Sequence, residues 1–259
     1  MKFFADEQEF ADGAPYTFDW QHITLICVMT VLIVVGLILL WKRRKKTTDI
    51  ALITLWIIQV VLEFGKIGLF VSYHGFGILR YRYCPIHLCS MYMYVFPFFM
   101  WGRGKIKQIA TAFCVTVSFF GGIINFAFSD MMSLVPALES FFGFHALLYH
   151  GIMVFCAILI GAKYYKMEKY DYIWVFLLLV FTSLPALIFD YVFGANYFFL
   201  RTGGTTPLGI ISKHIPHAWI WTIIIYVLYF GLCVMLHYAA KLCYFIDAKI
   251  KSKQKREVE

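Results

Sequence analysis

Long apolar runs separated by short polar stretches dominate this chain of 259 residues. A helix needs about 20 apolar residues to cross the hydrocarbon core of a bilayer, and runs of this kind predict seven membrane-spanning helices. Their expected ranges are 21–41, 50–72, 86–101, 108–128, 143–162, 172–193 and 218–240. The third run is short and carries Pro85 and Pro97, which a span tolerates where neighbouring helices satisfy the freed backbone groups. The pattern therefore predicts an all-α, polytopic membrane protein.

Composition supports this class, because 61% hydrophobic and only 15% charged residues exclude an ordinary water-soluble globule. The first apolar run follows an acidic head and lacks a small-residue cleavage site, so we expect a retained span and not a signal peptide. The expected organisation is an extracytoplasmic segment 1–20, a transmembrane domain 21–241 and a basic tail 242–259. Tryptophans fall at the predicted span ends, as interfacial aromatic residues should: Trp20, Trp41, Trp101, Trp174 and Trp219.

The distribution of lysine and arginine predicts the orientation, because cytoplasmic loops carry an excess of both. Of the 23 such residues, seventeen fall on the face that holds 42–46, 103–107, 163–169 and the tail from Lys241, five fall on the other face, and Lys66 lies within a span. The N-terminus is therefore expected outside and the C-terminus in the cytoplasm. A basic tail beside a last span indicates contact with anionic lipid and no nucleic-acid partner.

Hydrophilic side chains inside the predicted spans fall mainly in the halves nearer the outside. They are Glu63, Lys66, His87, Asn125, His150 and Asp190. An ionisable group in hydrocarbon is costly and usually faces the bundle interior or a wet cavity. We therefore expect one polar pocket that opens toward the outer leaflet.

Simpler structural interpretations remain open for several of these residues. Glu63 and Lys66 are three residues apart on one helix face and can neutralise each other. Asp190 can cap the end of its helix. Asn125 can bond to a neighbouring helix near Gly121, where a small residue lets backbones approach.

The histidines are the leading candidates for reactive groups. His87 is expected to open a helix directly after Pro85, where an imidazole is half wet and titrates near neutrality. His150 lies deeper in its span, where an unpaired ring would be unfavourable. His145 is five residues earlier, about 140° away around the helix, so it does not share a face with His150.

Several short motifs resemble the YwaF-like bacterial integral membrane protein family, which is related to transmembrane protein 164 of animals. They are Pro85-Ile86-His87-Leu88-Cys89, the helix of His150, Asp190-Tyr191, the run from Asn196 to Leu200, and Pro207. The resemblance covers roughly residues 18–240. It implies a multi-pass protein of the bacterial plasma membrane with lipid as its substrate.

The resemblance implies acyl-transfer chemistry, since the animal member is understood as a cysteine-dependent enzyme that moves an acyl chain onto an ether lysophospholipid. Its reactive cysteine directly precedes the histidine that matches His87. In this chain that position holds Ile86, so the family nucleophile cannot be carried over. Cys84 and Cys89 flank the place and are the remaining thiol candidates.

These residues favour a phospholipid acyltransferase or lipid ester hydrolase at the outer leaflet. A histidine can act as general base while an acid orients it, and a cation can hold phosphate. The catalytic candidates are His87, His150, Glu63 and Asp190, and the substrate-binding candidates are Lys66, Asn125, His145, Asn196 and Arg201. Without a protein nucleophile, His87 or His150 would activate the acceptor hydroxyl or water directly.

Other classes remain open. No cofactor is expected, although histidines with Glu63 and Asp190 make an acceptable zinc set. A proton-coupled small-molecule transporter also uses buried ionisable groups, but it needs a site reachable from both sides, and no inverted repeat is evident. A ligand-binding or scaffold protein with seven helices, alone or as a homo-oligomer, is the third alternative.

Overall fold

The computed structural model describes residues 2–10, 16–127, 131, 134–204 and 208–258, with the backbone alone for Lys2, Ala127 and 246–258. Pro207 lies outside the described residues. The described elements are α-helices and short 3-10 helices without any strand, which confirms the all-α class.

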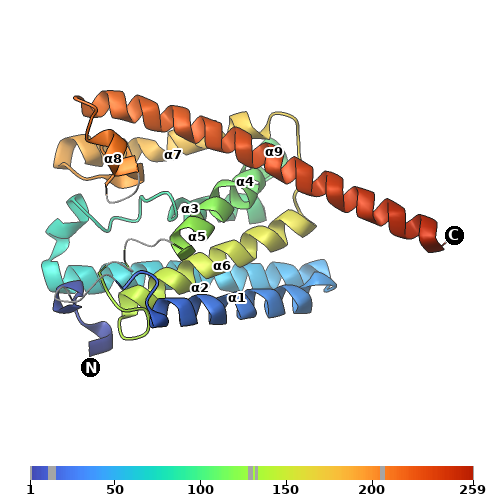
Figure 1. The fold of residues 1–259 in the computed structure, drawn as a ribbon, viewed down its shortest axis with the longest axis horizontal. Helices are drawn as coiled ribbons and strands as arrows, with labels where there is room; N and C mark the ends of the chain where they lie inside the picture. Colours follow the sequence, from blue (N-terminus) through green and yellow to red (C-terminus); the bar gives the residue numbers. More distant parts are fainter. Residues whose placement is uncertain (1, 11–15, 128–130, 132–133, 205–207, 259) are drawn as a thin grey trace.

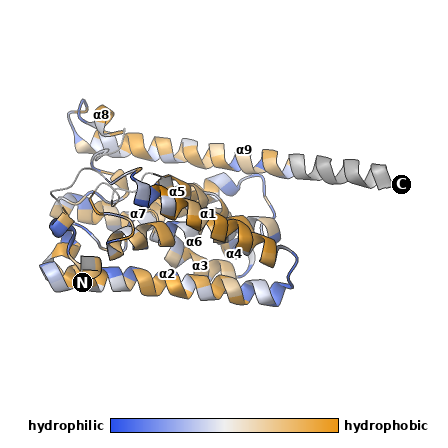
Figure 2. Ribbon diagram, turned by 60° about the horizontal axis from the view of Figure 1, so that its bottom comes forward, coloured by the Kyte–Doolittle hydropathy of each residue, from blue (hydrophilic) through white to orange (hydrophobic). Residues whose placement is uncertain are grey.

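Within these ranges, six helical stretches are long and apolar enough to cross a membrane (Figure 1). They are α1 (Trp20–Trp41), α2 (Lys45–His74), the consecutive α4 (Gly104–Val115) and α5 (Val117–Ala127), α6 (Phe141–Lys163), α7 (Asp171–Phe193) and α9 (Ala218–Val258). Their middle parts are predominantly hydrophobic and the connections between them more hydrophilic (Figure 2). The five predicted interfacial tryptophans are all exposed. The chain is therefore a multi-pass membrane protein.

The third predicted span differs from the structure. Helix α3 (Met91–Trp101) has 11 residues, which extend about 17 Å, or roughly half of a bilayer core. The expected helix start at 86 is wrong, because residues 81–90 form turns and bends after the short η3 (Phe76–Arg80). Proline at 85 disfavours helical backbone at the preceding residue and offers no N–H of its own. The seventh span is therefore not confirmed, and a non-helical stretch leads into α3.

The fourth predicted span is one crossing made of two helices. At Thr116, φ is −104° and ψ is −76°, and its hydroxyl donates to the Ala112 carbonyl at 2.7 Å. A threonine hydroxyl that bonds back to the preceding turn bends a helix. The bend separates α4 from α5.

Helix α6 is the most buried of the six stretches and α1 the least. Helices α1, α2, α4 and α5 all pack on α6, whereas α7 packs on α4 and α9. α5 and α6 approach closely at Gly122, where an added Cβ would lie 2.9 Å from Val154 Cγ2 and 3.3 Å from the His150 carbonyl oxygen. The absence of a side chain at 122 thus brings α5 against the part of α6 that carries the histidines.

The lysine-rich connections gather at one end of the bundle, which we call the lysine-rich end. There Lys163 Nζ, at the end of α6, donates to the carbonyl of Leu40 in the last turn of α1, to the carbonyl of Arg43 just after α1, and to the Thr48 hydroxyl in α2, at 2.7–3.0 Å. The bond to Leu40 satisfies a carbonyl that the helix end leaves open.

The opposite end is covered by the N-terminal segment and by the loop before α9. Short helices η1 (Lys2–Phe4) and η2 (Glu7–Phe10) lie there, together with η5 (Tyr197–Phe199) and α8 (Leu208–Ser212). Asp6 pairs with His74 at 3.1 Å, and Glu7 accepts from Arg82 at 3.0 Å and from the Tyr83 hydroxyl at 2.6 Å. Burial raises the pKa of Tyr83, so its hydroxyl stays a donor to Glu7 at neutral pH.

Substituting Gly122→Ala should destabilise the protein, because the new methyl group meets a backbone carbonyl that cannot move independently. Overpacking of this kind costs about 1–3 kcal/mol, and a fall of several degrees in the Tm of detergent-purified protein should follow. The matched control is Gly231→Ala in α9, where nothing lies within 4 Å of the added Cβ. An equal Tm for both variants would contradict the close approach.

Candidate functional site

A buried carboxylate on α2 is the centre of the polar residues. The Glu63 side chain is 2% exposed, and Lys66 Nζ donates to its Oε2 at 2.8 Å. The Ser90 hydroxyl donates to Oε1 at 3.2 Å, and His145 Nε2 lies 3.5 Å from Oε2. We call these four residues, which come from three separate parts of the chain, the Glu63 cluster.

The position of Ser90 explains how the carboxylate is accommodated. Ser90 directly precedes α3, so its bond to Glu63 places the carboxylate beside the N-terminus of that helix. The N–H groups of Met91, Tyr92 and Met93 already donate to carbonyls of residues 87–90, so it is the Ser90 hydroxyl that bonds to the carboxylate. Glu63 is therefore stabilised by the charge of Lys66 and by the Ser90 hydroxyl.

The two histidines of α6 are held differently. His150 Nδ1 lies 2.6 Å from the Ala146 carbonyl oxygen, which can only accept, so Nδ1 carries the proton. Its Nε2, like that of His145, is buried without a hydrogen-bond partner among the described residues. The His145 ring stacks on Tyr149, with centroids 5.6 Å apart. Each ring thus keeps one nitrogen free of protein hydrogen bonds.

His87 lies in the non-helical stretch before α3, contrary to the expected helix start. Its ring meets the ring of Tyr197 edge-on, with centroids 4.7 Å apart. Among the described residues, His145 is the histidine in direct contact with the ion pair, and neither His87 nor His150 makes a hydrogen bond or ion pair to Glu63 or Lys66.

Cys89 lies between the Glu63 cluster and α5. Asn125 Nδ2 donates to Cys89 Sγ at 3.1 Å and, within its own helix, to the Gly121 carbonyl at 3.1 Å. The bond that the sequence suggested to a neighbouring helix is made to the non-helical stretch before α3 instead. The Tyr149 hydroxyl reaches the Cys89 carbonyl at 3.4 Å. The amide of Asn125 and the tyrosine thus orient this segment and its thiol.

Cys84 has different surroundings, toward the covered end of the bundle. Its backbone N–H donates to the Tyr197 hydroxyl at 3.0 Å. Among the described residues, no hydrogen bond reaches the Cys84 thiol, whereas the amide of Asn125 contacts the Cys89 sulfur. Cys89 is therefore the thiol that has a positioned polar partner.

Three predicted site residues serve the loop after α7 and do not join the Glu63 cluster. Asp190 Oδ1 accepts from the Tyr197 N–H at 2.6 Å, so this carboxylate bonds to the loop after α7 instead of capping the end of its own helix. Asn196 Oδ1 accepts from the N–H groups of Arg201 and Thr202 at 3.2 and 3.0 Å. The Arg201 guanidinium donates to the Gly194 carbonyl at 2.7 Å. These side chains hold the loop together.

Sequence reasoning did not count four contributing residues among the site residues: Gln59, Ser90, Tyr149 and Tyr197. Gln59 is fully buried and donates to the Tyr149 carbonyl at 3.0 Å. It lies four residues before Glu63, one turn along the same helix face, and that spacing was a usable signal. Tyr197 contacts both His87 and Cys84, which no local pattern indicates.

The residues do not fit the zinc alternative. Among the described residues, no group of three or more His, Cys, Asp or Glu side chains is placed to hold a metal ion. Glu63 is engaged by Lys66 and Ser90, and Asp190 by the backbone after α7. The site therefore offers a carboxylate, an ammonium, imidazoles and a thiol, which are the groups of acid–base and nucleophilic chemistry.

Comparison with protein families gives one match, which covers most of the chain. The model of the TMEM164 family matches residues 17–238. The chain belongs to the TMEM164 family. This confirms the resemblance to transmembrane protein 164, while the YwaF-like name remains compatible with it. No curated protein and no solved structure matches the chain.

Replacing Glu63 by alanine should strongly destabilise this TMEM164 family protein, because Lys66 would keep a buried charge without its counterion. Breaking a buried ion pair in this way costs about 3–5 kcal/mol. The double variant Glu63→Met, Lys66→Met removes both charges and should recover much of the loss in Tm. A double variant no more stable than Glu63→Ala would contradict the pairing.

Proposed function

We propose that this protein is a lipid-modifying enzyme that transfers or hydrolyses an acyl chain at the outer leaflet. The observation that supports it is the Glu63 cluster beside a non-helical segment that carries His87 and Cys89. Irregular backbone at membrane depth is tolerated only where protein buries it or a cavity accommodates it. Here the irregular segment has polar partners in Glu63 and Asn125, and these groups are also suited to chemistry.

The proposed substrate is a phospholipid, because the site combines polar groups with lipid-facing helices. Lys66 donates one bond to Glu63, and an ammonium has three donors. Two remain for a phosphate oxygen or an ester carbonyl. Phe64 and Val61, on the same stretch of α2, are 53% and 64% exposed and offer an apolar surface to an acyl chain.

In the proposed first step, an imidazole of His87 or His145 takes the proton of the Cys89 thiol. The sulfur attacks the ester carbonyl, a C–S bond forms, and the C–O bond of the ester breaks. The imidazolium returns the proton to the departing alkoxide, which leaves as a lysolipid. Asn125 Nδ2, which contacts Cys89 Sγ, is suited to donate to the oxygen that becomes negative in this step.

In the second step, a hydroxyl group attacks the thioester carbonyl and the C–S bond breaks. A lysolipid hydroxyl gives acyl transfer, whereas water gives hydrolysis. A version without a covalent intermediate uses the unpartnered Nε2 of His150 as the base for the acceptor hydroxyl. Both versions need Glu63 as a carboxylate that stabilises a protonated imidazole.

Purified protein in nanodiscs should move a labelled acyl chain from phospholipid to lysophospholipid or to water. Cys89→Ala should lower the rate by roughly 100-fold or more, since a lost nucleophile or general base typically costs that much. Matched controls are Cys84→Ala and Cys27→Ala, which remove thiols that Asn125 does not contact.

The outcomes separate the versions of this proposal. Activity retained in Cys89→Ala but lost in a His87→Ala, His150→Ala double variant would favour direct activation of the acceptor. Full activity in that double variant and in Cys89→Ala would remove the site. Solute uptake driven by a pH gradient without lipid turnover would favour the carrier alternative.

The outer-leaflet assignment depends on orientation, which rests on the lysine and arginine distribution. A fluorescent protein that matures only in the cytoplasm, fused after Glu259, should fluoresce in cells. The same fluorescent protein, joined to Met1 through a short linker, should not fluoresce. The reverse pattern would move the proposed chemistry to the inner leaflet.

A further inference from the structure

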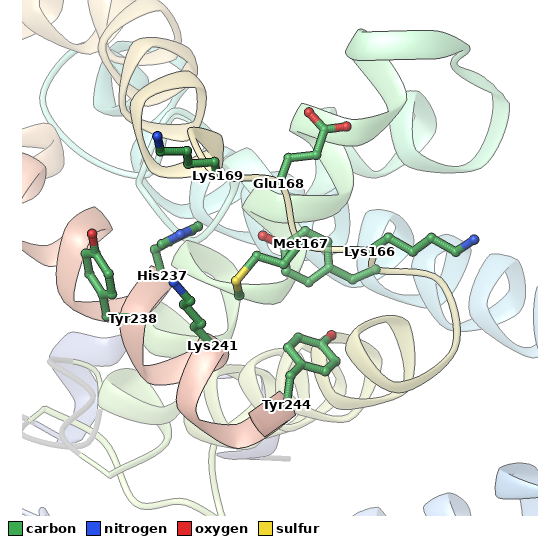
Figure 3. A pocket seen from close by; sticks show the side chains of 9 residues that line it. Lys166, Met167, Glu168, Lys169, His237, Tyr238, Lys241 and Tyr244 are labelled. Carbon is green, nitrogen blue, oxygen red and sulfur yellow. The ribbon is translucent and has the colours of Figure 1, made fainter. Parts of the chain in front are cut away.

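A cavity at the lysine-rich end of the bundle lies apart from the Glu63 cluster. It has a volume of about 500 Å3 and lies between the connection from α6 to α7 and the second half of α9 (Figure 3). Its lining comes from residues 165–169 and from His237, Tyr238, Lys241 and Tyr244. None of these residues belongs to the proposed acyl-transfer site.

The cavity carries an excess of positive charge. Lys169 and Lys241 have no ion-pair partner among the described residues, and their ammonium groups lie over the rings of Tyr170 and Tyr238, 5.0 and 5.8 Å from the ring centroids. The acid in the lining, Glu168, is neutralised from outside the cavity by Lys105 at 2.6 Å. The lining therefore favours an anion.

The histidine of the lining lacks a partner as well. His237 is 4% exposed, and its Nδ1 is buried without a hydrogen-bond partner among the described residues. It lies four residues before Lys241, so both side chains occupy one face of α9. In Figure 3, Lys169, His237 and Lys241 lie on the same side, whereas Lys166 extends away from His237 and Lys241.

Hydrogen bonds hold the residues that form the wall of the cavity in place. The Tyr165 hydroxyl and the Glu168 N–H both donate to Asp171 Oδ2 at 2.9 Å, and Gln108 Nε2 donates to the same oxygen at 2.9 Å. On the other side, the Tyr244 hydroxyl donates to the Gly161 carbonyl at 2.7 Å. The cationic groups are thus carried by fixed elements.

The surroundings indicate a lipid as the source of the anion. Leu242 and Phe245, on α9 beside the cavity, are 59% and 65% exposed. Such apolar exposure on a spanning helix is where acyl chains lie, and basic sites at the ends of spans bind anionic head groups. We propose that this cavity binds the phosphate group of an anionic phospholipid, held by Lys169, Lys241 and His237.

The test measures binding of phosphatidylglycerol to the purified full-length protein by native mass spectrometry or by a fluorescent competitor. Each lysine near a charged head group contributes about a fivefold change in affinity. Lys169→Gln with Lys241→Gln should therefore weaken binding roughly 25-fold, and Lys241→Gln alone about fivefold. The matched control is Lys46→Gln, which removes the same charge at the lysine-rich end but outside the lining and should leave affinity within about twofold.

Competition experiments distinguish a lipid head group from a soluble phosphate as the source of the anion. Phosphatidylcholine should compete weakly, and soluble glycerol phosphate should not displace the lipid at comparable concentration. Displacement by glycerol phosphate with equal affinity would overturn the lipid assignment. Unchanged phosphatidylglycerol affinity in the folded double variant, or an equal loss in Lys46→Gln, would overturn the site itself. Acyl-transfer activity is not a readout, so the two proposals can fail separately.

Discussion

A charged carboxylate deep in a membrane bundle needs compensation, and the arrangement around Glu63 supplies it from two directions. Lys66 provides the opposite charge, and Ser90 provides a hydrogen bond. Each source requires a particular backbone path. α3 has to begin at the depth of Glu63, and the residues before it have to descend there without helical structure.

That requirement links the irregular segment to the packing of the helices around it. The segment reaches Tyr197 after α7, Asn125 on α5 and Glu63 on α2. α5 can approach α6 because residue 122 has no side chain. The polar contacts and the close helix contacts therefore depend on each other, and the family membership extends over nearly the whole region that makes them.

Hydropathy was sufficient to predict most of the spans, because burial in lipid demands long apolar runs irrespective of neighbours. The spacing of Glu63 and Lys66 was sufficient to predict their pairing, since it is a property of one helix. Spacing along the chain was not sufficient to predict which histidine contacts Glu63, because the contact of His145 depends on how α6 is rotated against α2. The bonds that Asn196 and Arg201 make to backbone groups of their own loop could not be predicted either, because composition does not reveal a loop's backbone path.

The N-terminal segment has a consequence for how molecules reach the Glu63 end of the bundle. Asp6 and Glu7 fasten it to the end of α2 and to residues 82–83, directly before the segment that carries His87. A water-borne molecule that approaches along the membrane normal meets this cover first. A molecule already dissolved in the bilayer arrives sideways, between helices, and does not have to displace it.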